Sequence, residues 1–156
     1  MTWWRVCTAL GLAAVLSSAA SPAAQPPQPP QGTQAAARRS VWEGAYTKAQ
    51  ADRGKTAYDA DCAFCHGSDL SGQSFAPPLV GEPFTGRWQE GTLGDLFTIV
   101  KETMPQDKPA TLGDVTYAAI VAYLLESNRY PAGPDEMKPD PAALATVGFA
   151  RTPTGR

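Results

Sequence analysis

The sequence predicts a small all-α domain, on three observations. Three segments carry apolar residues at helical spacing, at about residues 47–62, 92–102 and 111–128. The stretches between them are rich in glycine and proline and indicate loops rather than strands. The chain has 156 residues, and because both of its ends look unsuited to a core, the folded part is limited to one domain.

Residues 1–20 are predicted to be a secretory signal peptide. Arg5 precedes an apolar run over residues 6–16, and small residues follow it. This run is shorter than the roughly 20 residues of a membrane span. We therefore expect cleavage after Ala20, with Ala24 as the alternative, and export to a bacterial periplasm. Contact with a membrane is expected only if the peptide is not cleaved.

The rest of the chain divides into a linker, a domain and a tail. Residues 21–40 consist mainly of proline, glutamine and alanine and predict a linker. The domain is expected over residues 41–133, and residues 134–156 are expected to form a flexible or surface-draped tail. Loss of Arg5 leaves 12 basic against 15 acidic residues, a net charge of −3 instead of −2. This balance is too mild to favour nucleic acid as a partner.

The first helix is predicted to begin at Thr47, which forms a capping-box pattern with Gln50. Gly54 and Tyr58 then lie on one helix face, with Tyr58 one turn before the next motif. The helix is expected to end near Gly67, because glycine readily takes a left-handed conformation.

The motif Cys62-Ala63-Phe64-Cys65-His66 has the C-x-x-C-H pattern of c-type haem attachment. Two thiols at this spacing can add to the two vinyl groups of one haem, and the following histidine can then bind the iron. The sequence therefore predicts one covalently bound haem c, with thioethers at Cys62 and Cys65 and His66 as an axial ligand.

Residues 67–91 contain five glycines and three prolines and are expected to wrap the haem as loops. The apolar faces of the macrocycle can replace missing secondary structure as a core. Arg87 and Trp88 have polar tips that could reach haem propionates. An ordinary surface or packing role fits them equally well.

Two further helices each open with Thr-x-x-Asp, at Thr92 and Thr111. The first is expected to bury three apolar residues and the second to carry an apolar stripe. These residues are Leu96, Ile99 and Val100 in the first helix, and Ile120, Tyr123, Leu124 and Ser127 in the second. Between the helices, Pro105 places Met104 on a turn.

Two other sites could use the same motif. A structural zinc site usually takes four ligands from two separated pairs, whereas the mature chain has only two cysteines and one histidine within five positions. A thiol-disulfide exchange site expects a strand-helix-strand context, and this segment is helical instead. Haem attachment is the favoured interpretation.

The sixth ligand of the iron is predicted by elimination to be Met104. His66 is the only histidine, Met1 is lost with the signal peptide, and Met137 lies in the proline-rich tail. Met104 lies 38 residues after His66, on a loop that could reach the opposite face of the haem. For an isolated methionine the usual alternative is core packing.

Residues 41–133 resemble a class I cytochrome c. Gly54 and Tyr58 match the family's first helix, Ile120 and Tyr123 match their partners on its last helix, and Pro77-x-Leu79 matches the P-x-L after the haem motif. The resemblance implies an all-α fold of three to five helices around one covalent haem, with Pro77 and Leu79 in the haem environment. It also implies that the Pro77 carbonyl accepts a hydrogen bond from His66 Nδ1–H.

A closer resemblance links the chain to the small cytochromes of quinoprotein (PQQ) alcohol dehydrogenases. It rests on short segments at residues 53–55, 93–97, 103–105 and 117–125. It implies an electron carrier whose donor is such a dehydrogenase and whose acceptor is a terminal oxidase or another cytochrome. The alternative is a peroxidase-like haem enzyme or a sensor with a displaceable sixth ligand, which would need an open iron site.

Overall fold

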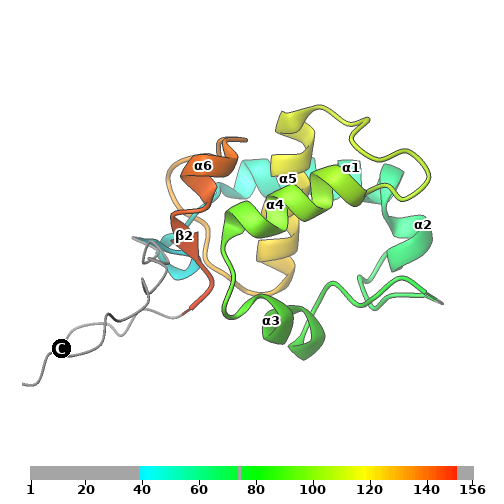
Figure 1. The fold of residues 1–156 in the computed structure, drawn as a ribbon, viewed down its shortest axis with the longest axis horizontal. Helices are drawn as coiled ribbons and strands as arrows, with labels where there is room; N and C mark the ends of the chain where they lie inside the picture. Colours follow the sequence, from blue (N-terminus) through cyan, green and yellow to red (C-terminus); the bar gives the residue numbers. More distant parts are fainter. Residues whose placement is uncertain (1–38, 74, 151–156) are drawn as a thin grey trace, which may run out of the picture. The chain divides into compact units, whose positions relative to one another are not determined.

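The computed structural model describes residues 39–73 and 75–150. The signal peptide and nearly all of the linker predicted for residues 21–40 lie outside this part. Six helices and two short strands follow one another (Figure 1), and the all-α prediction is confirmed. In chain order they are β1 (Arg39–Ser40), a 3-10 turn (Val41–Glu43), α1 (Lys48–Asp61), α2 (Ala63–His66), α3 (Glu82–Trp88), α4 (Leu93–Thr103), α5 (Asp114–Ser127), α6 (Pro141–Leu144) and β2 (Val147–Gly148).

The crossing of α1 and α5 is the centre of the fold. A Cβ atom on Gly54 would lie 1.8 Å from Ala119 O, so only glycine lets the two backbones approach this closely. Tyr58 and Tyr123 pack beside this contact with ring centroids 5.3 Å apart. Nine consecutive residues of α5, Tyr117 to Leu125, are buried, which makes it the central helix of the core.

The helix starts agree with the sequence in two of three cases. Thr47 accepts from Gln50 N, and Thr92 forms a complete capping box with Asp95. The third prediction is wrong, because α5 has Gly113 as its N-cap while the Thr111 hydroxyl donates to Lys108 O at 2.7 Å.

Two further expectations need correction. Residues 67–91 are not all loop, because α3 forms at Glu82–Trp88 with a proline in its first turn, a position that needs no N–H. Ile99 on α4 is 39 % exposed rather than buried. Val100 beside it is half-buried, whereas Leu93, Leu96 and Phe97 of the same helix are buried in the core.

The C-terminal segment is packed rather than flexible up to Ala150. Met137, Leu144 and Phe149 are buried in the core, although the intervening proline and alanine residues gave no periodic signal. Strand β2 pairs in parallel with β1 through Arg39 and Val147. The domain therefore includes residues beyond the boundary expected at 133.

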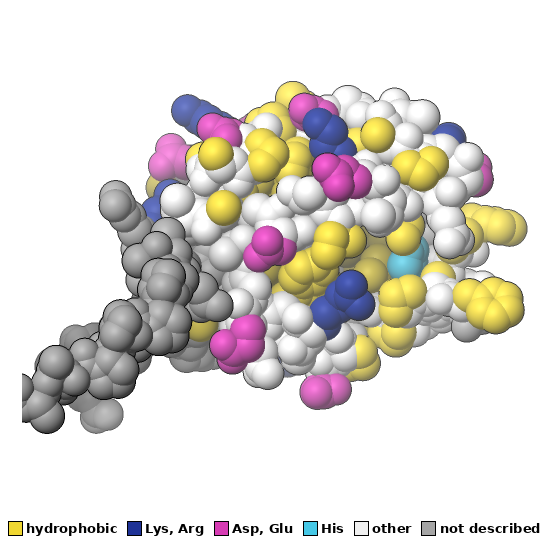
Figure 2. Space-filling view, in the orientation of Figure 1, with side chains coloured by type: hydrophobic (Ala, Val, Ile, Leu, Met, Phe, Trp, Pro, Cys, Tyr) yellow, Lys and Arg dark blue, Asp and Glu magenta, His cyan; other side chains and the backbone are white. Residues whose placement is uncertain are grey.

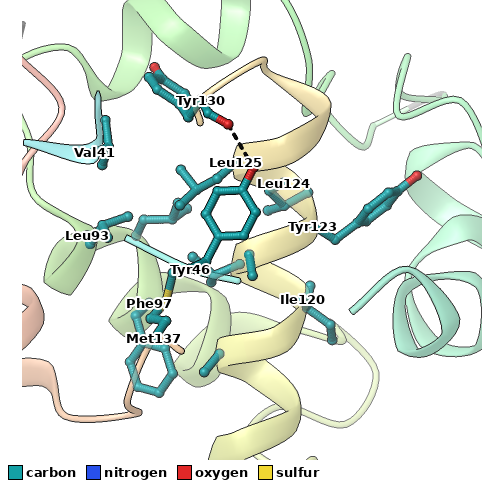
Figure 3. Packing of buried hydrophobic residues seen from close by; sticks show 14 of the residues in the cluster. Val41, Tyr46, Leu93, Phe97, Ile120, Tyr123, Leu124, Leu125, Tyr130 and Met137 are labelled. Carbon is teal, nitrogen blue, oxygen red and sulfur yellow. Dashed lines mark hydrogen bonds between the residues drawn. The ribbon is translucent and has the colours of Figure 1, made fainter. Parts of the chain in front are cut away.

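Gln50 explains how this segment is held. Its amide donates to Met137 O and accepts from Met137 N, both at 2.8 Å, and the side chain is buried. Nearby, the Tyr46 hydroxyl donates to Tyr130 O at 2.7 Å, as Figure 3 shows among the buried residues around α5. A long-range side-chain contact of this kind leaves no periodic pattern in the sequence.

Within residues 39–73 and 75–150, no helix combines the length and the apolar character needed to cross a bilayer.

Candidate functional site

The C-x-x-C-H motif lies at a break between two helices. Cys62 ends α1, its N–H donating to Tyr58 O, and α2 begins at the next residue. The N–H groups of Cys65 and His66 both donate to Cys62 O, at 3.1 and 3.0 Å. Both cysteines of the motif are free thiols, Cys65 exposed and Cys62 half-buried. They are three positions apart on one turn, the spacing at which two thioether bonds attach one haem.

The His66 ring is held in one orientation. Its Nδ1 lies 3.0 Å from Pro77 O, the contact that the resemblance implies. A carbonyl oxygen only accepts, so Nδ1 carries the hydrogen and Nε2 keeps the lone pair that could bind a metal. The backbone supports this arrangement, because Gly72 N donates to His66 O at 2.8 Å.

Met104 is the residue that ends α4 and begins the loop to α5. It is half-buried, and its carbonyl accepts from the Tyr117 hydroxyl at 2.7 Å. The loop that follows reaches the haem motif, since Lys108 Nζ lies 3.1 Å from Oδ1 of Asp61, the residue before Cys62. The structure thus brings the Met104 loop beside the start of the C-x-x-C-H motif.

An apolar hollow lies next to His66. Figure 2 shows hydrophobic side chains exposed in a depression between α4 and α3, with the histidine at its edge. Half-buried apolar residues from four different segments pack against the hydrophobic core, and two phenylalanines within or shortly after the motif are almost fully exposed. The half-buried residues are Cys62, Leu79, Val80, Val100 and Leu112, and the exposed ones are Phe64 and Phe75.

These features fit a haem. The hollow provides the apolar surface that a macrocycle buries, and the donor set of two thiols, one oriented imidazole and one thioether is that of a c-type haem. Pro77 contacts His66 as the resemblance implies, and the place of Pro77 and Leu79 in the haem environment stays a prediction. The assignment of each ligand to the iron remains a prediction.

Arg87 and Trp88 lie on α3. Trp88 is buried, with its ring centroid 6.2 Å from that of Phe149 and 6.4 Å from that of Phe84. The Arg87 guanidinium lies 5.5 Å from the Trp88 ring centroid, a cation–π distance. Both residues thus have packing partners, and their contact with propionates stays a prediction.

The two rival sites gain no support from the geometry. Among residues 39–73 and 75–150, no three His, Cys, Asp or Glu side chains cluster so as to hold a metal ion. Burial, reinforced by Asp61 and Cys65, raises the pKa of the Cys62 thiol to about 11. Because the thiolate is the nucleophile in disulfide exchange, a raised pKa disfavours that chemistry at neutral pH.

Sequence reasoning missed three polar contacts around the site. The Tyr58 hydroxyl donates to Gly67 O at 2.7 Å, directly after His66, and the Tyr117 hydroxyl holds Met104 O. Asn128 bonds the backbone of the segment after Pro77. Only Asn128, at the end of a predicted helix, carried a local signal, since asparagine is common at helix ends.

Sequence comparison relates part of the chain to known cytochrome proteins. Residues 49–124 match the family model described as cytochrome c oxidase, cbb3-type, subunit III. The cbb3-type cytochrome c oxidase subunit CcoP of Azospirillum brasilense is 44 % identical over 59 residues, or 34 % of this chain and 18 % of that protein. The thiosulfate dehydrogenase of Stutzerimonas stutzeri (strain A1501) is 32 % identical over 88 residues, or 53 % of this chain and 28 % of that protein.

The chain thus aligns with less than a third of either curated relative. Among solved structures, the sulfane dehydrogenase SoxCD of Paracoccus pantotrophus aligns with a TM-score of 0.41 at 22 % identity, over 71 % of this chain and 61 % of that one. The match over residues 49–124 and the C-x-x-C-H motif within it support a c-type cytochrome domain in this all-α chain, whose cofactor is covalently bound haem c.

Proposed function

We propose that the protein is an exported one-electron carrier in which His66 and Met104 are the two axial ligands of a single haem c. Haem c supplies an iron that takes up and releases one electron. With a nitrogen ligand and a sulfur ligand in place, no position on the iron is left for a substrate, and methionine–histidine ligation raises the reduction potential.

The observation that carries this proposal is the contact between His66 Nδ1 and Pro77 O. This contact leaves Nε2 as the ligand atom and fixes the orientation of the ring, as the hydrogen-bonded second nitrogen of metal-binding histidines does. Met104 begins a loop whose Lys108 pairs with Asp61, the residue just before the haem motif. Met137 is an unsuitable rival, because both of its backbone groups are bonded to Gln50 in the core.

We further propose that the donor is a quinoprotein dehydrogenase of the alcohol dehydrogenase type and that the acceptor is a terminal oxidase or another cytochrome. The support is the sequence resemblance at residues 93–97, 103–105 and 117–125. The curated relatives widen the set of candidates, because one is an oxidase subunit and the other a thiosulfate dehydrogenase. A carrier needs brief, weak encounters, so the mildly negative chain predicts a modest dependence of the rate on salt.

Stopped-flow mixing tests the donor. The ferric holoprotein is mixed with a reduced quinoprotein alcohol dehydrogenase from the same organism, and in parallel with thiosulfate alone. We expect haem reduction at least as fast as the dehydrogenase turns over, and no reduction by thiosulfate. Reduction far slower than turnover would contradict this donor but not the carrier function, and oxidation of thiosulfate would indicate an enzyme.

Ligand binding tests the carrier function itself. Rapid binding of cyanide to the native ferric protein, or of carbon monoxide to the ferrous protein, would point instead to a peroxidase-like enzyme or a sensor with an open or labile sixth position. We expect both reactions to be slow in the native protein and fast in the Met104→Ala variant.

A further inference from the structure

One end of α5 contacts the loop that begins at Met104, and the other end contacts the segment just after Pro77, whose carbonyl lies against His66. Near its start, the Tyr117 hydroxyl donates to Met104 O at 2.7 Å and lies 3.4 Å from Leu112 N, from which it accepts. One buried hydroxyl therefore bonds both ends of the loop from Met104 to Leu112.

At the end of α5, Asn128 makes an equivalent contact with the other segment. Its Nδ2 donates to Leu79 O at 2.8 Å, and its Oδ1 accepts from Gly81 N at 3.0 Å. Nδ2 also donates to Leu124 O at 2.8 Å, which fixes the amide to its own helix. Because one side of the amide meets a carbonyl and the other an N–H, only one orientation satisfies all three bonds.

Leu79 connects this contact to His66. Pro77, two residues earlier, provides the carbonyl that lies 3.0 Å from His66 Nδ1. Both backbone groups of Leu79 are bonded: its N–H donates to Leu70 O at 2.8 Å, and its carbonyl accepts from Asn128 Nδ2. A shift of this segment would move the Pro77 carbonyl relative to the imidazole.

We propose that Tyr117 and Asn128 are positioning residues for the two axial ligands, Tyr117 for Met104 and Asn128, through Pro77, for His66. Helix α5 acts as a rigid spacer, because its residues from Tyr117 to Leu125 are buried and the two anchors are about 16 Å apart along a regular helix. The Tyr117 half rests on the proposed role of Met104 as sixth ligand, whereas the Asn128 half depends only on His66.

The test compares single variants of the holoprotein with matched controls. Tyr117→Phe removes only the hydroxyl, and Tyr46→Phe is its control, because Tyr46 donates at the same 2.7 Å to a backbone carbonyl, Tyr130 O, that belongs neither to the Met104 loop nor to residues 77–81. Asn128→Ala is paired with Ser127→Ala, which removes a hydroxyl that donates to Tyr123 O within the same helix. If Asn128→Ala yields no folded holoprotein, Asn128→Asp, which keeps the acceptor for Gly81 N, is measured instead.

Each variant is expected to change the signature of its own ligand. Loss of one buried hydrogen bond corresponds to about a fivefold change in a local equilibrium. Tyr117→Phe should therefore speed cyanide binding to the ferric iron about fivefold and leave the solvent exchange of the His66 Nδ1 proton in the ferrous protein unchanged. Asn128→Ala should speed that proton exchange about fivefold and retain the sulfur-to-iron charge-transfer band of the ferric protein.

Other outcomes overturn the proposal. Equal changes in Tyr117→Phe and Tyr46→Phe, or in Asn128→Ala and Ser127→Ala, would mean that these residues act only on stability. If Met104→Ala keeps the charge-transfer band, Met104 is not the ligand, which overturns the Tyr117 half and the proposed ligation together. In that case the exchange rate of the His66 Nδ1 proton alone decides the proposed role of Asn128.

Discussion

The regions around Met104 and Met137 differ in how they bury apolar surface. Met137 is buried by protein alone, with its backbone bonded to Gln50 and with Val41, Tyr46 and Phe97 in the same core (Figure 3). Met104 is half-buried at the end of α4, in a part of the molecule that leaves several apolar residues exposed, among them Phe64, Phe75 and Ile99.

This difference indicates which side of the domain needs a cofactor to cover its apolar residues. We call the two sides the protein-only side, with Met137, and the haem side, with Met104. The side with Met137 closes its core with β1, β2 and α6, which cover it with chain from both ends of the domain. The side with Met104 has an apolar hollow instead, and we expect a haem to complete that part of the core. The predictions below test the two sides separately, from the largest expected effect to the smallest.

Removal of the haem attachment should have the largest effect. In Cys62→Ala combined with Cys65→Ala, the hollow beside His66 loses the group that covers it, and we expect no stable holoprotein. In the wild-type protein, acid denaturation followed by extraction with organic solvent should leave the haem on the polypeptide. Haem that passes into the solvent would contradict thioether attachment.

Among contacts made by protein alone, Gly54→Leu should be the most damaging single substitution. A Cβ at Gly54 meets Ala119 O at 1.8 Å, so α1 and α5 must separate. We expect a loss in the free energy of unfolding at or above the roughly 1 to 3 kcal/mol typical of overpacking. Gly113→Ala is the control, because a Cβ there meets nothing nearer than Thr116 Oγ1 at 4.0 Å.

Denaturant unfolding measures both variants. A loss of only a few tenths of a kcal/mol in Gly54→Leu would mean that the helices do not cross at Gly54.

Gln50→Ala should loosen the C-terminal segment without touching the haem. Both Met137 backbone groups lose their partner in the buried core, which should cost about 1 to 3 kcal/mol for each group left unsatisfied. The control is Arg53→Ala, which breaks the exposed pair with Glu136 and should cost about 1 kcal/mol or less. Hydrogen exchange around residues 137–149 should rise in Gln50→Ala alone, with an unchanged haem spectrum.

A smaller effect is expected from pH. Burial, helped by the charge of Glu126, raises the pKa of Tyr46 to about 12. The folded state then holds this proton more tightly than the unfolded state, whose tyrosine titrates near pH 10. Stability from this group is therefore fully present below about pH 10 and is lost as the pH rises toward 12.

Unfolding at about pH 9 and about pH 11.5 measures this dependence. Tyr46→Phe should be less stable at the lower pH, and its free energy of unfolding should fall less between the two values than that of the wild-type protein. Equal slopes for the two proteins would show that Tyr46 is not the group responsible.

The sequence predicted the features that depend on local patterns. The capping residues Thr47 and Thr92, the C-x-x-C-H turn and the apolar α5 are each encoded within a few positions, and the structure has all of them, although α5 is capped by Gly113 rather than Thr111. The tail was misjudged because its burial depends on Gln50, 87 positions away from Met137, and on strand pairing of only two residues. Helix α3 was missed because glycine and proline dominate its surroundings.

Of the site, the haem motif and the contact between His66 and Pro77 followed from the sequence, but the contacts of Tyr117 and Asn128 did not. Each joins a helix end to a backbone carbonyl in a distant loop, and such a contact depends on how the helices pack. Elimination favoured Met104 over Met137 for an incomplete reason. Met137 is unsuitable because it is buried and bonded in the core, rather than because it lies in a tail.

The ferric absorption spectrum of a matched pair of variants tests the account most directly. Leucine replaces the methionine side chain at nearly constant volume and lacks the sulfur. Met104→Leu should lose the weak sulfur-to-iron charge-transfer band and bind cyanide rapidly, whereas Met137→Leu should keep the band and the slow binding of the wild-type protein. A band that survives in Met104→Leu, or disappears in Met137→Leu, would contradict the assignment of the two methionines to the haem side and the protein-only side.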